Sequence, residues 1–310
     1  MKMLITGGAG FIGSHLAEFY CDKKYEIFIL DDLSTGHRSN VEFIDDKHFI
    51  KSCITNKSLV EDLIKKEQFD IVIHLAAVVS VVESINNPIR SQKINIDGTL
   101  NLLETNRRHN ENLKRFIFAS SAAVYGNTKS LPKKTDSFID PESPYAIEKY
   151  TGEQYTKIYN NLYKLPTTSL RFFNVYGPRQ DPNSPYSGVL SIMKSKFANN
   201  ETFTFYGDGK QTRDFVYVKD LVQAVSVVIN NEESSGEIFN LGTGKQISLI
   251  NMFEKFEILY KRTIDKKFTT VRSGDIKESY AQIEALKNLG YSPKYSIEEG
   301  LEEYINYVGS

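Results

Sequence analysis

The sequence predicts an α/β protein with a doubly wound parallel sheet and a smaller C-terminal lobe. Two observations favour this fold class. Short apolar runs alternate with amphipathic stretches through the first half of the chain, as in strands and helices that build a parallel sheet through right-handed crossovers. A glycine-rich turn joins the first apolar run to the first amphipathic stretch. The second half is less regular.

Five apolar runs are expected to form buried strands, and they cover residues 3–6, 26–31, 70–76, 115–121 and 167–173. Helices are expected between them at 13–22, 56–67, 88–109 and 145–163. Further along, long polar loops are predicted at 177–188 and 206–214, a strand and turn at 237–244, and a closing helix at 299–308. Long ordered loops are usually functional, so we expect these to build a lobe over the carboxyl edge of the sheet.

The same reading divides the chain into two domains. The first covers residues 1–170, and the chain returns to it around 215–245. The second lobe is formed mainly by residues 171–310.

Composition excludes several classes of function. The 310 residues are 40% apolar and 25% charged, and the net charge is −1, so nothing indicates a nucleic-acid or membrane partner. The two cysteines, Cys21 and Cys53, form no disulfide framework and lack metal-ligand spacing. The N-terminus lacks a small-residue cleavage site, and no apolar run approaches the roughly 20 residues that span a bilayer. We expect a cytoplasmic protein without a metal.

The stretch "MLITGGAGFIGSHL" places three glycines between a strand and a helix. Gly7 permits a tight turn, Gly10 lets a pyrophosphate approach the backbone, and Gly13 allows close packing of helix against sheet. The helix N-terminus offers unpaired N–H groups and a positive dipole to phosphate. This context predicts a Rossmann-type dinucleotide site, although a tight turn without a ligand is the structural alternative.

The second strand ends in "LDDLSTG", where a carboxylate commonly holds the adenosine ribose hydroxyls. Asp31 is the candidate, and an acid here disfavours a 2′-phosphate, so NAD is expected rather than NADP. His37 and Arg38 lie nearby and leave NADP open. A plain surface-turn carboxylate is the alternative for Asp31.

The stretch "SPYAIEK" (143–149) places Tyr145 and Lys149 four residues apart at the start of a predicted helix, which Pro144 and a Ser143 cap favour. Residues at this spacing share one helix face. A free tyrosine has a pKa of about 10, and an adjacent cation favours its phenolate. The pair therefore predicts an acid–base site, with an ordinary helix as the alternative.

Over essentially all 310 residues, the sequence resembles the extended short-chain dehydrogenase/reductase family. Within that family it looks like the nucleotide-sugar 4-epimerases of the UDP-glucose 4-epimerase type. The resemblance rests on motifs in the expected order: "GGAGFIGSH", "HLAA", "SSAAVYG", "SPYAIEK", "RFFNVYGPRQDP", "RDFVYVKDL" and "NLGTG". It implies an NAD-dependent enzyme acting on a UDP-sugar, and a homodimer.

The resemblance also implies roles for single residues. Tyr145 is expected to be the catalytic base and acid, Lys149 to lower its pKa and hold the nicotinamide ribose, and Ser121 to hydrogen-bond the sugar 4-hydroxyl. The implied cofactor-binding residues are Gly7, Gly10, Phe11, Ile12, Gly13, Asp31, Asp32, Ser34, Gly36, Ile54, Leu75, Ala76, Ala77, Asn95, Tyr145, Lys149 and Phe172. The implied substrate-binding residues are Ser121, Asn174, Val189, Thr204, Tyr206, Arg213, Arg272, Asp275 and Ser279.

Two positions bear on the choice of reaction and substrate. Related 4,6-dehydratases carry an Asp–Glu pair after the serine, whereas this chain has Ala122–Ala123, which cannot transfer a proton. Ser279 in "GDIKES" falls where a small residue resembles enzymes that admit N-acetyl groups. UDP-GlcNAc and UDP-GalNAc are therefore expected substrates, together with UDP-Glc and UDP-Gal.

Two departures from the family pattern concern the cofactor. Cys53 stands where an acidic residue often meets adenine, and Val79 replaces a lysine found in some UDP-glucose enzymes. The readings left open are a UDP-glucuronate 4-epimerase and a non-catalytic NAD-binding sensor. Three of the substrate-site assignments have structural alternatives. Arg213 and Asp214 could form a plain surface ion pair, Asp275 could cap a helix, and Ser279 could be a surface serine of a helix.

Overall fold

A seven-stranded parallel sheet forms the centre of the computed structural model, which describes residues 1–181, 188–271 and 276–307. Its strand order is β11-β6-β5-β4-β1-β2-β3. The strands are β1 (Lys2–Thr6), β2 (Glu26–Asp31), β3 (Phe49–Lys51), β4 (Ile71–His74), β5 (Arg115–Ser121), β6 (Thr167–Phe172) and β11 (Ile238–Leu241). Every neighbouring pair is parallel, which confirms the predicted fold class.

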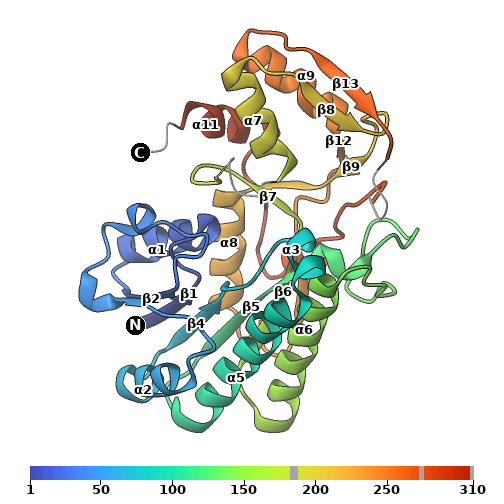
Figure 1. Cartoon of the computed structure of the whole chain (residues 1–310). Coiled ribbons are helices and arrows are strands. Elements are labelled where there is room, and N and C mark those ends of the chain that lie inside the picture. Colours follow the sequence, from blue (N-terminus) through green and yellow to red (C-terminus); the bar gives the residue numbers. More distant parts are fainter. Residues whose placement is uncertain (182–187, 272–275, 308–310) are drawn as a thin grey trace.

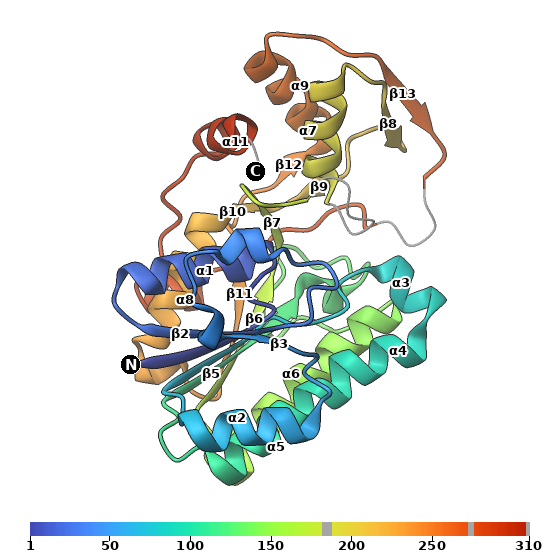
Figure 2. The ribbon, with the colours of Figure 1, turned by 60° about the vertical axis from the view of Figure 1, so that its left-hand side comes forward.

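Both faces of the sheet are buried under helices, as Figures 1 and 2 show. Along β1, Met3 and Ile5 pack into one apolar cluster, whereas Leu4 packs into another on the opposite face. Successive side chains of a strand point to opposite faces, so an apolar run without polar alternation requires cover on both sides. One face carries α1 (Phe11–Asp22) and α8 (Val218–Ile229), and the other carries α2 (Lys57–Glu67), α5 (Gly98–His109) and α6 (Pro144–Tyr163).

Several local details differ from the sequence prediction. The helix expected at 88–109 is divided into α4 (Pro88–Gln92), a π-helical turn (Lys93–Asp97) and α5. Strand β3 and helix α3 (Val81–Asn86) were not predicted. Strand β3 has only three residues and none of them is fully buried, so it lacks the apolar run that marks the other strands.

The second half of the chain adds a group of elements above the carboxyl edge of the sheet (Figure 2). They are α7 (Val189–Asn199), β8 (Phe203–Tyr206), β9 (Thr212–Arg213), β12 (Ile247–Ser248), α9 (Leu249–Tyr260), β13 (Lys266–Thr269) and α11 (Ile297–Asn306). An aromatic-rich cluster of their own holds them together, centred on Phe197, Phe205 and Phe253.

Two further segments connect this group to the sheet. β7 (Asn174–Tyr176) pairs in parallel with β10 (Phe215–Tyr217), and the chain then returns to the large sheet through α8 and β11. The short α10 (Glu284–Asn288) contacts β11. The predicted loop 206–214 contains β9, and the strand predicted within 237–244 is confirmed as β11, which begins at Ile238. The boundary at residue 170 stays a prediction.

None of the helices in the described ranges is long and apolar enough to cross a membrane.

A buried ion pair joins α6 to β6. The guanidinium of Arg171 donates to both carboxylate oxygens of Glu153, at 2.6 and 2.8 Å, and both side chains are almost fully buried. Ser120 Oγ also donates to Glu153 at 2.9 Å. This carboxylate therefore links the carboxyl ends of β5 and β6 to the helix that carries Tyr145 and Lys149.

We predict that Glu153→Ala lowers the free energy of unfolding by about 3–5 kcal/mol, because the substitution leaves the Arg171 charge buried and unpaired. Urea unfolding followed by circular dichroism measures this change. The matched control is Glu61→Ala, which removes the carboxylate of the exposed ion pair with Lys65 and should change stability little. Equal effects of the two substitutions would contradict the role assigned to Glu153.

Candidate active site

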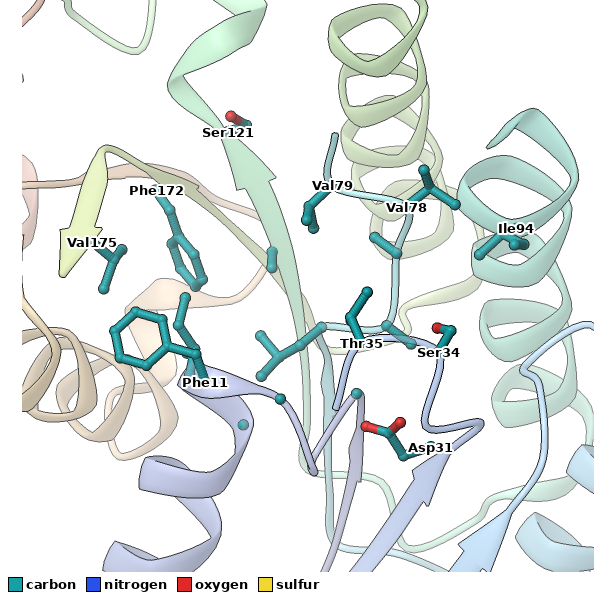
Figure 3. Close-up of a pocket in the computed structure, with 18 of the residues that line it drawn as sticks. Phe11, Asp31, Ser34, Thr35, Val78, Val79, Ile94, Ser121, Phe172 and Val175 are labelled. Atoms are coloured by element: carbon teal, nitrogen blue, oxygen red, sulfur yellow. The ribbon is translucent and has the colours of Figure 1, made fainter. Parts of the chain in front are cut away.

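The candidate site is a cavity of about 520 Å³ at the carboxyl ends of the central strands. The strand order reverses between β1 and β4, and this switch point is where open α/β sheets bind their ligands. The glycine turn after β1 lines the cavity together with the ends of β2, β4, β5 and β6 and the start of α6. In Figure 3, Asp31 lies beside the glycine turn, whereas Ser121 lies on the far side of the cavity.

The turn after β1 is built for a close approach of the backbone. Gly7 has a φ of +70°, and a Cβ placed there would lie 2.7 Å from the backbone nitrogen of Ala76. α1 begins at Phe11, and its cap residue Gly10 provides no side-chain acceptor for the first N–H groups. Those donors face an anion most favourably, so the turn fits the pyrophosphate of a dinucleotide.

Asp31 is held in place at the end of β2. It is 8% exposed, and its two carboxylate oxygens accept from Ala9 N at 2.9 Å and Leu33 N at 2.8 Å. Burial raises the pKa of the Asp31 carboxyl, and the two backbone N–H groups oppose that rise. The surface-turn alternative for Asp31 is therefore wrong, since the side chain is buried and lines the cavity.

Arg38 is engaged within its own loop. Its guanidinium donates to the backbone oxygens of Val41 and Ile44 and to the Asp46 carboxylate. These bonds use the donors that a 2′-phosphate would need, so the arrangement agrees with NAD rather than NADP. The start of the same loop rests on the glycine turn, because His37 N donates to Ala9 O at 3.0 Å.

Tyr145, Lys149 and Ser121 meet at the other end of the cavity. Ser143 caps α6 as predicted, accepting from Ala146 N at 3.2 Å. Lys149 is 5% exposed, its Nζ donates to Ala119 O at 2.8 Å, and the same nitrogen lies 5.9 Å from the centre of the Tyr145 ring. The side chain of Ser121 forms a hydrogen bond with Tyr145.

The pKa values of the pair differ from the sequence prediction. Burial raises the pKa of the Tyr145 phenol, and the hydrogen bond with Ser121 opposes the rise. Burial lowers the pKa of Lys149 to about 8, whereas the neighbouring Glu148 carboxylate acts to raise it. In the protein alone, the Tyr145 phenol is therefore protonated at neutral pH. The pKa of Lys149 lies close enough to neutral pH that part of its ammonium loses the proton there.

The cavity brings together most of the predicted site residues. Those that line it are Gly7, Gly10, Phe11, Ile12, Gly13, Asp31, Asp32, Ser34, Ile54, Leu75, Ala76, Ala77, Ser121, Tyr145, Lys149, Phe172 and Asn174. Gly36 and Asn95 are buried and do not line it. Four residues, Val189, Thr204, Tyr206 and Arg213, belong to the second group of elements, and Ser279 lies outside any helix or strand. None of the five lines the cavity. Arg272 and Asp275 lie outside the described residues.

Arg213 and Ser279 are neighbours although they are far apart in the sequence. Ser279 N donates to Thr212 O at 3.2 Å, so backbone pairing places Ser279 beside β9. Ser279 is 6% exposed and lies outside any helix, so the surface-helix alternative is wrong. Arg213 and Asp214 form no surface pair, because Asp214 is fully buried and accepts from the backbone N–H groups of Thr243, Gly244 and Ala281.

Several residues that line the cavity were not predicted. Val78, Ile94 and Val175 contribute apolar surface, Thr35 extends the loop after β2, and Val79 also lines the cavity (Figure 3). Val78 and Val79 directly follow "HLAA", so their position after a buried strand was the available signal. Ile94 comes from the π-helical turn, for which the sequence carries no such signal. Arg179 and Gln180 line the cavity from the loop after β7.

Comparison with known proteins identifies the family. Residues 3–242 match the model of the NAD dependent epimerase/dehydratase family. The chain belongs to this family. It is 38% identical over 309 residues to a putative UDP-glucose 4-epimerase of Methanocaldococcus jannaschii, covering 99% of this chain and 98% of the relative.

Two solved structures are similar over nearly the whole chain. One is UDP-glucose 4-epimerase of Thermotoga maritima with UDP-glucose, at a TM-score of 0.93, 35% identity, and coverage of 99% and 98% of the two chains. The other is UDP-N-acetylglucosamine 4-epimerase of Methanobrevibacter ruminantium in complex with UDP-N-acetylmuramic acid. Its TM-score is 0.91, its sequence identity is 36%, and the alignment covers 98% of this chain and 96% of that chain. These findings confirm the predicted family and its cofactor, NAD, and support a nucleotide-sugar epimerase.

We predict that Asp31→Asn weakens NAD binding by about tenfold, because a hydrogen bond from a ribose hydroxyl to a charged acceptor is lost. The preference for NAD over NADP should fall as well, since the carboxylate no longer repels a 2′-phosphate. Calorimetric titration of cofactor-free protein with each dinucleotide measures both effects. Asp45→Asn, at an exposed carboxylate outside the cavity, is the matched control. An unchanged ratio of the two affinities would contradict this role of Asp31.

Proposed function

We propose that the chain is an NAD-dependent 4-epimerase that interconverts UDP-GlcNAc with UDP-GalNAc, and UDP-Glc with UDP-Gal. One observation carries the proposal: Ser121, Tyr145 and Lys149 meet at one end of the cavity whose other end contains the glycine turn and Asp31. A dinucleotide bound along that cavity extends from Asp31 towards these three side chains, which are those needed to move a proton at a sugar hydroxyl.

Each of the three side chains has a distinct role. Tyr145 accepts the proton of the sugar 4-hydroxyl and later returns a proton to the same oxygen. Ser121, already hydrogen-bonded to Tyr145, steadies that oxygen while it is a ketone. Lys149 provides a positive charge that favours the phenolate. When bound, NAD supplies the acceptor and then the donor of the hydride at carbon 4, and a second positive charge near the phenol.

Inversion requires that the 4-keto sugar present its other face before the hydride returns. The site must therefore hold the nucleotide firmly and the sugar loosely. We assign the firm contacts to Asn174 at the start of β7, and to Arg213, Arg272 and Asp275. Arginine suits the diphosphate because its planar fork of donors matches phosphate oxygens.

Epimerisation needs fewer groups than elimination. Residues 122 and 123, directly after Ser121, are alanines, so this turn offers no additional acid or base for removing water across carbons 4 to 6. A UDP-glucuronate 4-epimerase is the second candidate, and it would need an added cation near carbon 6 of the sugar.

The decisive experiment uses the purified protein without added cofactor. We incubate it separately with UDP-GlcNAc, UDP-Glc and UDP-glucuronate and follow the anomeric proton signals by NMR. Growth of the galacto-epimer from the first two supports the proposal, and Tyr145→Phe should abolish it. Turnover of UDP-glucuronate alone would support the second candidate. Binding of NAD without turnover of any sugar would support a non-catalytic sensor.

We also propose a cytoplasmic homodimer. Ile147, Ile158 and Leu162 lie along one face of α6 and are exposed by 51%, 47% and 67%, which is a row of apolar side chains suited to a second copy. Tyr159, in contrast, is buried and donates to Glu104 at 3.0 Å, so it belongs to the core. A solution mass twice that of the chain is expected from light scattering, and a monomeric mass would contradict the proposal.

Substrate size is assigned to Ser279. We predict that Ser279→Tyr abolishes turnover of UDP-GlcNAc and spares UDP-Gal, because a phenol at this wall fills the space of the N-acetyl group. Activity with each substrate is measured by the same NMR assay. Thr263→Tyr, at an exposed position after α9 and outside the predicted site, provides a control for added bulk. Equal loss of both activities in Ser279→Tyr would reject the assignment.

A further inference from the structure

A second buried carboxylate lies beside the catalytic pair. Glu148 is 3% exposed and immediately precedes Lys149 on α6. Its Oε2 accepts from Ser91 Oγ at 2.7 Å and from Asn95 Nδ2 at 2.6 Å. Buried carboxylates are rare unless they are paired, and the roles assigned above to Ser121, Tyr145 and Lys149 make no use of this one.

Glu148 acts on the cavity wall through Asn95. The Asn95 side chain accepts from Val78 N at 2.8 Å and donates to Val78 O at 2.9 Å. Because the same amide nitrogen also donates to Glu148, the carboxylate fixes which way the amide points. Val78 lines the cofactor cavity, as Figure 3 shows. The chain of contacts therefore runs from Glu148 through Asn95 to the wall at Val78.

Glu148 also brings a charge next to the reacting groups. Across residues 1–181, 188–271 and 276–307, no lysine, arginine or histidine forms an ion pair with its carboxylate. The charge is therefore felt by its neighbours on α6, and it acts to raise the pKa values of both Tyr145 and Lys149.

We propose that Glu148 is a positioning residue of the epimerase site: its buried carboxylate fixes Asn95 and the Val78 wall, and it keeps Lys149 in its charged form. This inference rests on the proposed function for its link to turnover. Burial alone pulls Lys149 towards neutrality, and a neutral lysine no longer favours the phenolate of Tyr145. An anion one residue away opposes that loss without touching the substrate.

The other charged groups on elements packed against α6 are ion-paired, neutral, exposed or, for Arg115 alone among the described residues, hydrogen-bonded to uncharged acceptors. His74 on β4 is buried, and burial lowers its pKa to about 3, so it is uncharged at neutral pH. Lys93 and Asp97 in the π-helical turn are exposed. Four ion pairs account for most of the remaining groups: Glu83–Arg90, Glu104–Arg107, Glu104–Arg108 and Glu153–Arg171. The Tyr125 hydroxyl contacts Arg171, and His109 on α5 lies 3.3 Å from the Glu61 carboxylate. Arg115, at the start of β5, is buried and donates to Asn231 O and Thr168 Oγ1.

The test is the pH dependence of kcat in Glu148→Gln. Tyr145 must be deprotonated to accept a proton, so its pKa sets the acid limb of the profile. Lys149 must be protonated, so its pKa sets the alkaline limb. Removing the negative charge lowers both pKa values, and both limbs should move to lower pH by on the order of one unit. Glu254→Gln, at an exposed carboxylate of α9, should leave both limbs in place.

A second variant separates charge from geometry. Glu148→Asp keeps the carboxylate but shortens the side chain, so the limbs should stay near those of the wild type while NAD binding weakens several-fold as Asn95 loses its partner. The proposal would be overturned if the two limbs of the kcat pH profile stay in place in Glu148→Gln, or if they move by the same amount in both variants. If Glu148→Gln does not fold, the pH profile of Glu148→Asp is the test, and a shift of its limbs from those of the wild type would overturn the proposal.

A spectroscopic readout keeps this inference separate from the proposed function. The phenolate absorbance of NAD-loaded protein, taken as a difference from Tyr145→Phe, reports the ionisation of Tyr145 without any sugar. It should appear at lower pH in Glu148→Gln than in the wild type. If no UDP-sugar is turned over but this shift is seen, the proposed function fails and the role of Glu148 stands. If a UDP-sugar is turned over but the shift is absent, the proposed function stands and the role of Glu148 fails.

Discussion

The close packing of α6 against β5 is the constraint on which the site depends. A Cβ at Gly152 would overlap the ring of Phe118, so the helix approaches the strand closely only because residue 152 has no side chain. At this separation Lys149 Nζ reaches the backbone oxygen of Ala119 at 2.8 Å. The hydrogen bond fixes the lysine over the sheet and leaves Tyr145 facing Ser121 at the end of β5. A wider gap would leave the ammonium buried without an acceptor, at a substantial cost in free energy.

Buried polar groups hold the same region rigid from three sides. Glu153 accepts hydrogen bonds from both Ser120, which precedes Ser121, and Arg171. Asp31 accepts a hydrogen bond from the backbone of the glycine turn. Glu148 accepts hydrogen bonds from Ser91 and Asn95, in the segment after β4. Networks whose members all have partners favour one arrangement over others. The cavity is thus shaped partly by Glu148 and Glu153, which do not line it, and partly by Asp31, which does.

Much of this could be predicted from the sequence, because the strongest signals are local. Continuous apolar runs marked the strands near residues 3–6, 26–31 and 115–121, and the glycine spacing marked the turn after β1. The missed features depend on tertiary contacts. The π-helical turn at Lys93–Asp97 brings Asn95 and Ile94 to their positions without any composition signal. Likewise, the backbone hydrogen bond between Ser279 and Thr212 joins two segments that are far apart in the sequence, so no local pattern predicts it. The stretch "YAIEK" also gives no sign that Glu148 is buried.

The sequence also misjudged the acid–base balance. The spacing of Tyr145 and Lys149 suggested a lowered phenol pKa, whereas burial in the protein alone raises it. Desolvation depends on the whole surroundings of a side chain, which spacing along a helix does not report. The proposed role of Tyr145 as a base therefore requires the positive charges of Lys149 and of the bound cofactor to act together.

The central claim is that these groups oxidise carbon 4 of a bound UDP-sugar and then reduce it again with the same hydride. The most direct measurement is to run the reaction of UDP-GlcNAc or UDP-Glc to equilibrium in deuterium oxide and examine carbon 4 of the recovered epimers by NMR and mass spectrometry. The account predicts epimers that carry no deuterium at carbon 4. Deuterium at that carbon would show inversion by proton exchange with solvent and would contradict the account.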